Sequence, residues 1–152
     1  MQRRRAIAAV TLGLGWAHAA LAREAVLPSS RSLAQELANA LRAGKPLVVM
    51  VSLDGCVYCR AVRQSYLAPM HRDEDLAVVQ VDMNSSQITR SFKGEATSHA
   101  ALVRAWGIKV APTVLFFGRG GAEVAERLAG ASVPDFYGAY LDDRLAAARA
   151  RL

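Results

Sequence analysis

The strongest constraint on the fold is an apolar run that ends in a pair of cysteines. Residues 46–53 read Pro-Leu-Val-Val-Met-Val-Ser-Leu, and Cys56 and Cys59 follow at once. A run so continuously apolar and so rich in valine predicts a central strand that is covered on both faces. From Val57 onward the apolar positions change to helical spacing. The sequence therefore predicts a buried strand that turns into a helix, with both cysteines at the turn.

This position has chemical consequences for the two cysteines. The first turn of a helix has unpaired N–H groups and the positive end of the helix dipole, which favour thiolate over thiol at Cys56. Cys59 lies one turn further on, close enough to close a small disulfide ring. These are the only two cysteines in the chain. Because so short a ring removes little entropy from the unfolded chain, we interpret the pair as a dithiol–disulfide redox site.

The first 22 residues have the features of a secretory signal peptide. Arg3–Arg5 precede the apolar segment Ala6–Trp16, and Ala20-Leu21-Ala22 matches the small-x-small pattern of a cleavage site. The apolar segment is short for a membrane span. We therefore expect residues 1–22 to be cleaved and the protein to be periplasmic; an uncleaved N-terminal anchor, or a cytoplasmic protein with an apolar N-terminus, is the alternative.

The remaining residues, 23–152, have a length that suits one domain with one core. The formal net charge of the whole chain is +6, and three of the arginines that contribute to it lie in the signal segment. Neither a run of lysine and arginine nor a basic patch interleaved with aromatic residues remains. We therefore expect no nucleic-acid partner, and we expect a monomer.

Helical and strand patterns alternate along this domain. Ser32 and Gln35 have the spacing of a helix capping box, and two apolar strands separated by a helix are typical of a parallel βαβ unit. We expect an α/β domain with a mixed central β-sheet and helices on both faces. The predicted elements are helix 33–41, strand 47–53, a helix from 57 to about 67 or 70, strand 76–82, a long loop 84–98, helix 100–106, a turn and strand within 108–117, a hairpin turn 118–121, an edge strand 123–128, and a helix capped at Ser132 that ends near 149.

Two motifs within this order of elements resemble the thioredoxin superfamily. Cys56-Val57-Tyr58-Cys59 stands at the strand–helix junction, and Trp106-Gly107-Ile108-Lys109-Val110-Ala111-Pro112-Thr113 leads into a later apolar strand. The resemblance covers the chain from about Lys45 and implies a thioredoxin-like fold. The export signal and the long insert with Phe92-Lys93-Gly94 are similar to those of secreted bacterial thioredoxin-like proteins, including the SoxW type.

The resemblance also implies roles for four residues. Cys56 is the expected nucleophile, and Cys59 is the expected buried resolving thiol. Pro112 corresponds to a cis-proline that faces the disulfide; cis X-Pro bonds are uncommon. In this arrangement the backbone of Ala111 is exposed and pairs with an extended segment of substrate.

Two aromatic residues complete the predicted substrate site. Tyr58 lies at a helix start beside the reactive cysteine, a position that is usually exposed, and we expect it to contact substrate. Trp106 is most simply a core residue, but its place before the Ala111-Pro112 motif also allows it to lie at the border of the substrate groove.

The chain departs from the thioredoxin pattern at two positions. Cytoplasmic thioredoxins have a buried aspartate six residues before the first cysteine, where this chain has Met50. The tryptophan that usually precedes the first cysteine is replaced by Gly55. Asp54 is nearer to the cysteines, but we expect it to be solvated in the turn. Proton transfer at Cys59 therefore needs another route, through water or the backbone.

The motif leaves the direction of electron flow open. Val57 and Tyr58 place no positive charge between the cysteines, which favours a reductase of protein or small-molecule disulfides over a thiol oxidase or isomerase. Because no further cysteine pair is present, we expect an external donor, a membrane-embedded thiol transporter. The alternative is that the protein is not an enzyme but a binding module. The replacement of the buried aspartate by Met50 would fit that alternative.

Metal and cofactor sites have little support in the sequence. Zinc needs two ligands besides the cysteines, and the histidines outside the signal segment, His71 and His99, lack the paired spacing of a zinc finger. Covalent haem needs a histidine after the second cysteine, where Arg60 stands. We expect no metal and no cofactor, and we expect both histidines to be solvated. An inert structural disulfide is the remaining alternative.

Overall fold

The central strand β1 (Leu47–Ser52) forms at the apolar run, and all of its residues are buried. The computed structural model describes residues 24–131 and 134–152. In it, β1 pairs in parallel with β2 (Val78–Asp82) and antiparallel with β5 (Thr113–Phe117). The short strand β6 (Leu128–Ala129) pairs with β5, so the strand order is β2-β1-β5-β6. The predicted mixed sheet is confirmed.

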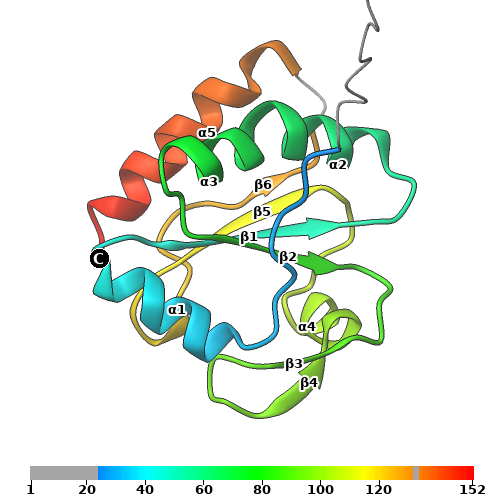
Figure 1. Ribbon diagram of the computed structural model, residues 1–152, viewed down its shortest axis with the longest axis vertical. Helices are drawn as coiled ribbons and strands as arrows, with labels where there is room; N and C mark the ends of the chain where they lie inside the picture. Colours follow the sequence, from blue (N-terminus) through cyan, green and yellow to red (C-terminus); the bar gives the residue numbers. More distant parts are fainter. Residues whose placement is uncertain (1–23, 132–133) are drawn as a thin grey trace, which may run out of the picture.

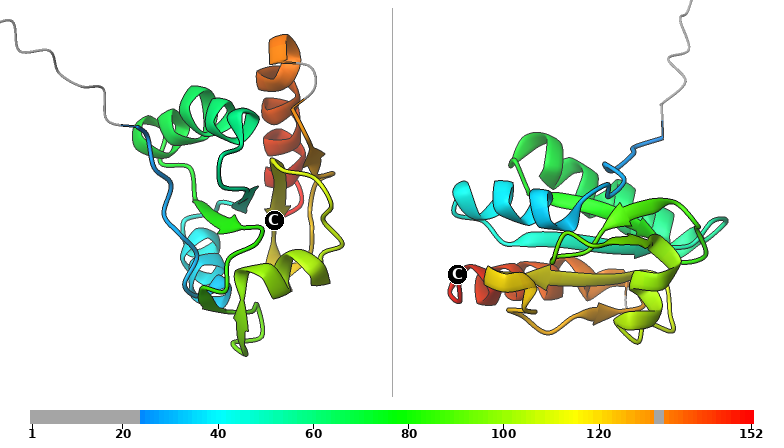
Figure 2. Two further views of the ribbon diagram at one scale, coloured as in Figure 1. Left: turned by 90° about the vertical axis from the view of Figure 1, so that its right-hand side faces the viewer. Right: turned by 90° about the horizontal axis from the view of Figure 1, so that it is seen from below.

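Helices cover both faces of this sheet (Figures 1 and 2). One face packs against α2 (Val57–Val62), α3 (Ala68–Asp73) and α5 (Pro134–Arg149), and the other packs against α1 (Leu33–Arg42) and α4 (His99–Ala105). Because successive strand residues point to opposite faces, Val48 and Met50 join the first layer and Val49 and Val51 join the second. The predicted fold class, α/β with helices on both faces, is therefore confirmed.

The helix that follows the cysteines is longer than predicted. The segment α2 continues through a π-helical turn, η1 (Arg63–Leu67), into α3 and ends at Asp73. Pro69 comes just after this π-helical turn, in which the Ala68 N–H bonds to the Arg63 carbonyl five residues back, so the proline lies where the hydrogen-bond register of the helix changes. The proline therefore does not end the helix, which is why the boundary predicted near residues 67–70 is wrong.

The predicted loop 84–98 contains two strands. The segments β3 (Ile88–Arg90) and β4 (Ala96–Ser98) form an antiparallel hairpin apart from the main sheet. Each strand has three residues, which is too short for an alternating pattern to be visible in a polar sequence. The prediction of a loop was therefore wrong.

The predicted edge strand 123–128 is also wrong in extent. The turn after β5 contains a short 3₁₀ helix, η2 (Arg119–Gly121), and a single bridge joins Phe117 to Glu123. Val124 and Ala125 are then both buried, so the side chains no longer alternate between faces and regular pairing stops. Strand pairing resumes only at β6, with Leu128 opposite Val114.

The segment before α1 lies along the edge of β2. Its Ser30 N–H donates to the Gln80 carbonyl at 2.9 Å, and the Gln80 N–H donates to the Pro28 carbonyl at 2.7 Å. Ser32 caps α1 as predicted, but the returning carboxylate is that of Glu36, which accepts the Ser32 N–H at 3.1 Å. The predicted signal segment, residues 1–22, and the predicted cap at Ser132 lie outside the described residues.

Within residues 24–131 and 134–152, every helix is too short or too polar to span a bilayer.

His99 is buried, so the prediction that it is solvated is wrong. Its Nδ1 accepts the backbone N–H of Asp82 at 3.1 Å. A ring nitrogen that accepts carries no proton, so Nε2 carries it and donates to the Ser30 carbonyl at 2.9 Å. This histidine ties the end of β2 to the segment before α1. His71 is half-buried, and its Nδ1 lies 2.8 Å from the Leu76 carbonyl.

We predict that the His99→Ala variant loses about 2–4 kcal/mol of unfolding free energy, because it leaves a cavity, deprives the Asp82 N–H of its partner and leaves the Ser30 carbonyl with the Gln87 amide as its donor. The His71→Ala variant is the control and should lose less than about 1 kcal/mol, since water reaches that site. Urea unfolding of the oxidised proteins measures both values. Equal losses in the two variants would contradict the structural role given to His99.

Candidate active site

The turn between β1 and α2 places the two cysteines. The Cys56 N–H donates to the Leu53 carbonyl at 3.2 Å, and the Asp54 carboxylate accepts the Gly55 N–H at 3.0 Å. Gly55 has a φ of +71°, a conformation that glycine adopts without steric cost. Asp54 is exposed, as predicted. The turn carries the chain from the buried end of β1 to the surface position of Cys56.

The two cysteines form a disulfide, and their environments differ. Cys56 is the N-cap residue of α2 and is half-buried, whereas Cys59 is fully buried. The Cys59 N–H donates to the Cys56 sulfur at 3.1 Å. Because a bond from an N–H stabilises negative charge, this geometry favours a thiolate at Cys56 once the disulfide is reduced. Cys56 is therefore the more accessible sulfur of the pair, and it is the one that accepts an N–H.

The loop before β5 faces the cysteines. The Ala111–Pro112 peptide bond is cis, and the Ala111 carbonyl oxygen lies 3.9 Å from the Cys56 sulfur. The Thr113 hydroxyl donates to the Val110 carbonyl at 2.7 Å, which fixes the loop on its other side. The structure thus brings the two motifs that are far apart in the sequence to one place.

The two predicted aromatic site residues have different surroundings. Tyr58 is 59% exposed at the start of α2, and it lines a small apolar pocket with Tyr66 and Tyr137. Burial raises the pKa of Tyr137 above its ordinary value, so this phenol is neutral. Trp106 packs in the opposite layer, with its ring centroid 5.5 Å from that of Phe117. These contacts of Trp106 are those of a core residue, and its role at a substrate groove stays a prediction.

The position of the missing aspartate is filled by apolar packing. Met50 is fully buried in the same cluster as Cys59 and Val62. Ser52, two residues further along β1, points to the same face and is also buried. Its hydroxyl oxygen lies 3.4 Å from the Nη1 of Arg63. The next polar side chain along this face of β1 is therefore the Ser52 hydroxyl, which contacts the Arg63 guanidinium.

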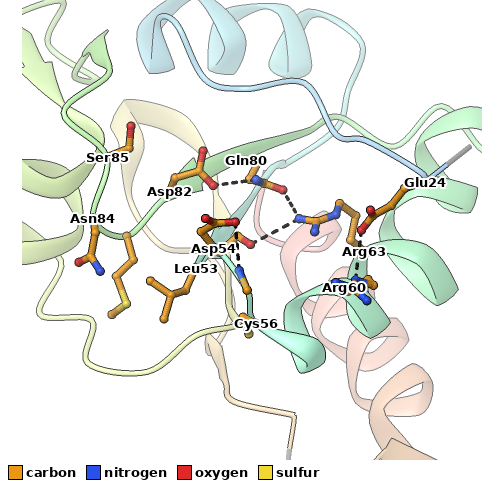
Figure 3. Close-up of a pocket in the computed structure, with 13 residues that line it drawn as sticks. Glu24, Leu53, Asp54, Cys56, Arg60, Arg63, Gln80, Asp82, Asn84 and Ser85 are labelled. Atoms are coloured by element: carbon orange, nitrogen blue, oxygen red, sulfur yellow. Dashed lines mark hydrogen bonds and ion pairs between the residues drawn. The ribbon is translucent and has the colours of Figure 1, made fainter.

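A cavity of about 660 Å³ lies beside Cys56, where the carboxyl ends of β1 and β2 meet the start of α2 (Figure 3). Ligands of open α/β sheets often bind at this edge of parallel strands. Polar and charged side chains make most of its wall; they are Glu24, Ser52, Asp54, Arg60, Arg63, Gln80, Asp82, Asn84 and Ser85. The Arg60 guanidinium pairs with the Glu24 carboxylate at 3.2 Å.

Three residues of this wall that were not predicted from the sequence form a chain of hydrogen bonds; they are Arg63, Gln80 and Asp82. Arg63 follows Cys56 by seven residues, two helical turns, and so shares its helix face. Gln80 and Asp82 are the polar residues in an otherwise apolar strand, and parallel pairing sets them beside Met50 and Ser52. The seven-residue spacing of Arg63 from Cys56, and the two polar residues within an apolar strand, are the sequence signals that could have identified these residues.

No group of three histidine, cysteine or acidic side chains that could hold a metal ion occurs among residues 24–131 and 134–152.

Comparison with known proteins agrees with the fold and the cysteine pair. Residues 33–145 match the thioredoxin-like domain family, and the chain belongs to this family. Its fold and its Cys-x-x-Cys disulfide make it a thioredoxin-like thiol-disulfide oxidoreductase. No curated protein matches the chain.

Several solved structures have a similar fold. Thioredoxin h from poplar is 21% identical, with 76% of this chain and 96% of that chain covered and a TM-score of 0.52. Thioredoxin f from spinach chloroplast is 20% identical, with 82% and 97% covered and a TM-score of 0.50. An oxidoreductase named DsbH is 17% identical, with 84% and 89% covered and a TM-score of 0.53.

The difference in burial between the two sulfurs predicts a difference in reactivity. In the reduced protein, iodoacetamide should modify Cys56 at least about tenfold faster than Cys59, because alkylation needs an accessible thiolate. Mass spectrometry of timed digests measures both rates. The Cys56→Ser variant, whose one thiol is Cys59, should react as slowly as Cys59 does in the parent. Equal rates at the two sulfurs would contradict the assignment of Cys56 as the nucleophile.

Proposed function

We propose that this protein is an exported reductase of disulfides in which Cys56 attacks the substrate and Cys59 resolves the intermediate. The observation that carries the proposal is the asymmetry of the pair. Cys56 is the half-buried cap of α2, and its sulfur accepts the Cys59 N–H from the first turn, whereas the Cys59 side chain is enclosed in the core. A thiolate that is both accessible and stabilised is the nucleophile of disulfide exchange.

The reaction starts from the dithiol form. The Cys56 thiolate attacks one sulfur of the substrate disulfide; that bond breaks, and one substrate thiolate leaves and takes up a proton. Cys59 then loses its proton and attacks the Cys56 sulfur, so the mixed disulfide breaks and the second substrate thiol is released. Two electrons pass to the substrate, and the protein ends with the Cys56–Cys59 disulfide seen in the structure.

An extended segment of a protein substrate fits beside Ala111 in this proposal. The Ala111 carbonyl lies next to the Cys56 sulfur, so a backbone N–H of the substrate can bond to it while the substrate disulfide lies over Cys56. Pro112 follows in the cis form and keeps this backbone turned toward the cysteines. In this proposal exposed Tyr58 contacts the substrate on the helix side.

Regeneration of the dithiol requires an external donor. The chain has no cysteine besides Cys56 and Cys59, so a second dithiol protein must reduce the disulfide. For an exported protein the electrons have to cross the membrane, which favours a membrane-embedded thiol donor. The residues between the cysteines, Val57 and Tyr58, carry no positive charge, which favours the reductase direction over oxidation of folding proteins.

We predict that Cys59→Ser accumulates a covalent adduct when the reduced variant is mixed with insulin, because no resolving thiol attacks the mixed disulfide. Non-reducing gels with mass spectrometry detect the adduct, and dithiothreitol should release it. The Cys56→Ser variant is the control and should give no adduct and only the uncatalysed rate of insulin reduction. If the wild-type protein reduces insulin no faster than Cys56→Ser does, the pair is not an active site and a binding role is favoured.

Export also has a direct test. The features of residues 1–22 predict cleavage after Ala22, so the full chain produced in a bacterium with a periplasm should be recovered from the periplasmic fraction. Intact mass should then correspond to residues 23–152, eluting as a monomer in gel filtration. The Ala20→Leu/Ala22→Leu double variant, which removes the small residues, should stay uncleaved. An intact N-terminus in the wild-type protein would overturn this part of the proposal.

A further inference from the structure

Among the described residues that line the cavity beside Cys56, one cationic group has no ion-pair partner; the wall also carries the carboxylates of Asp54 and Asp82, and neither pairs with an arginine of the wall. Arg60 is the other arginine in its wall, and its guanidinium forms an ion pair with Glu24 (Figure 3). Arg63 bonds to the Gln80 amide oxygen at 2.7 Å and lies 3.4 Å from the Ser52 hydroxyl, both neutral partners. Within the part of the chain that the structure describes, Arg63 forms no ion pair.

The guanidinium of Arg63 also has donors to spare. Both of its contacts are made through Nη1, whereas a guanidinium carries five N–H donors. Nη2 and Nε are not among the buried polar atoms that lack partners in the described residues, so solvent in the cavity reaches them. A planar fork with open N–H groups matches the two oxygens of a carboxylate.

The position of Arg63 is fixed before any ligand arrives. Gln80 accepts from Arg63 and its amide nitrogen donates to the Asp82 carboxylate at 2.7 Å. The Asp82 backbone is held in turn by buried His99. Because the amide stands between the guanidinium and the carboxylate, the two charges stay separated and the cation remains available to a ligand.

The size and place of the cavity indicate a small ligand that reaches the sulfur. Its volume of about 660 Å³ lies in the range of small-molecule sites. Cys56 is part of its wall, as are Arg60 and Arg63 from the same helix. A molecule held by Arg63 in this cavity can therefore extend toward Cys56.

We propose that this cavity binds a low-molecular-weight disulfide that carries a carboxylate, with Arg63 binding the carboxylate while Cys56 attacks the disulfide. The inference rests on the proposed function and names a substrate class for the same site. In the first step the Cys56 thiolate forms a bond to the near sulfur, the substrate S–S bond breaks, and the far thiolate leaves and is protonated. Attack by Cys59 on Cys56 then releases the carboxylate-bearing thiol.

The test compares three small disulfides that differ in charge. Dithiodipropionate is a dianion, hydroxyethyl disulfide is neutral and cystamine is a dication. Each is mixed with pre-reduced protein in a single turnover, and acid quenching with mass spectrometry follows formation of the protein disulfide. We expect the rate constant for the dianion to exceed that for the neutral compound by about tenfold, the effect of one charge-assisted hydrogen bond.

The variants assign this preference to Arg63. In Arg63→Gln the ratio of the dianion rate to the neutral rate should fall to about one, because the charge is lost. In Arg63→Lys the ratio should remain above one, because the charge is kept without the planar fork. Arg104→Gln removes an exposed charge from α4, outside the cavity wall, and should leave the ratio unchanged.

Added salt supplies a readout that does not depend on a folded variant. The dianion preference of the wild-type protein should shrink as ionic strength rises, since screening weakens the attraction. If all three disulfides react at equal rates in the wild type, or if Arg63→Gln keeps the preference, the inference is wrong and the proposed function stands. If neither these compounds nor insulin is reduced, the proposed function itself fails.

Discussion

A sulfur atom caps the first turn of α2, and the rest of the site depends on this bond. Helix caps are usually serine, threonine or aspartate, whose oxygen accepts an N–H that otherwise has no partner. Here the Cys56 sulfur accepts the Cys59 N–H, so the group that starts the helix is also the proposed nucleophile. The helix holds Cys59 within disulfide distance, and the same N–H stabilises the Cys56 thiolate when the bond is open.

Packing of the sheet decides which sulfur is exposed. The face of β1 that carries Met50 is closed by α2 and α5, and Cys59 lies in that core. Apolar packing ends at Ser52, where the parallel strands β1 and β2 reach their carboxyl ends and leave a polar cavity. Cys56 stands at the boundary between these regions. Its sulfur lies 3.9 Å from the Ala111 carbonyl, and the residue also lines the cavity that holds Arg60 and Arg63, so the two proposed substrates, a protein segment and a small charged ligand, meet different surroundings at Cys56.

The sequence predicted best where a pattern was long and local. The apolar run at 47–53 and the helical spacing after Val57 identified β1, α2 and the sulfurs between them. The hairpin of β3 and β4 was missed because its strands are too short to show a period. His99 was misjudged for another reason: its burial depends on hydrogen bonds to Ser30 and Asp82, which are distant in the sequence. Arg63 was missed for the same reason, since its partners, Ser52 on β1 and Gln80 on β2, are also distant from it in the sequence.

The reduction potential of the Cys56–Cys59 pair tests the central claim, that this is an exchangeable dithiol poised to donate electrons. The protein is equilibrated in glutathione or dithiothreitol buffers of known potential, and thiol alkylation with mass analysis gives the fraction of disulfide. The account predicts a reversible two-electron transition near the thioredoxin value, about −270 mV. A value near about −120 mV would identify an oxidant and contradict the proposed direction. A disulfide that does not exchange at any potential would contradict the enzyme itself.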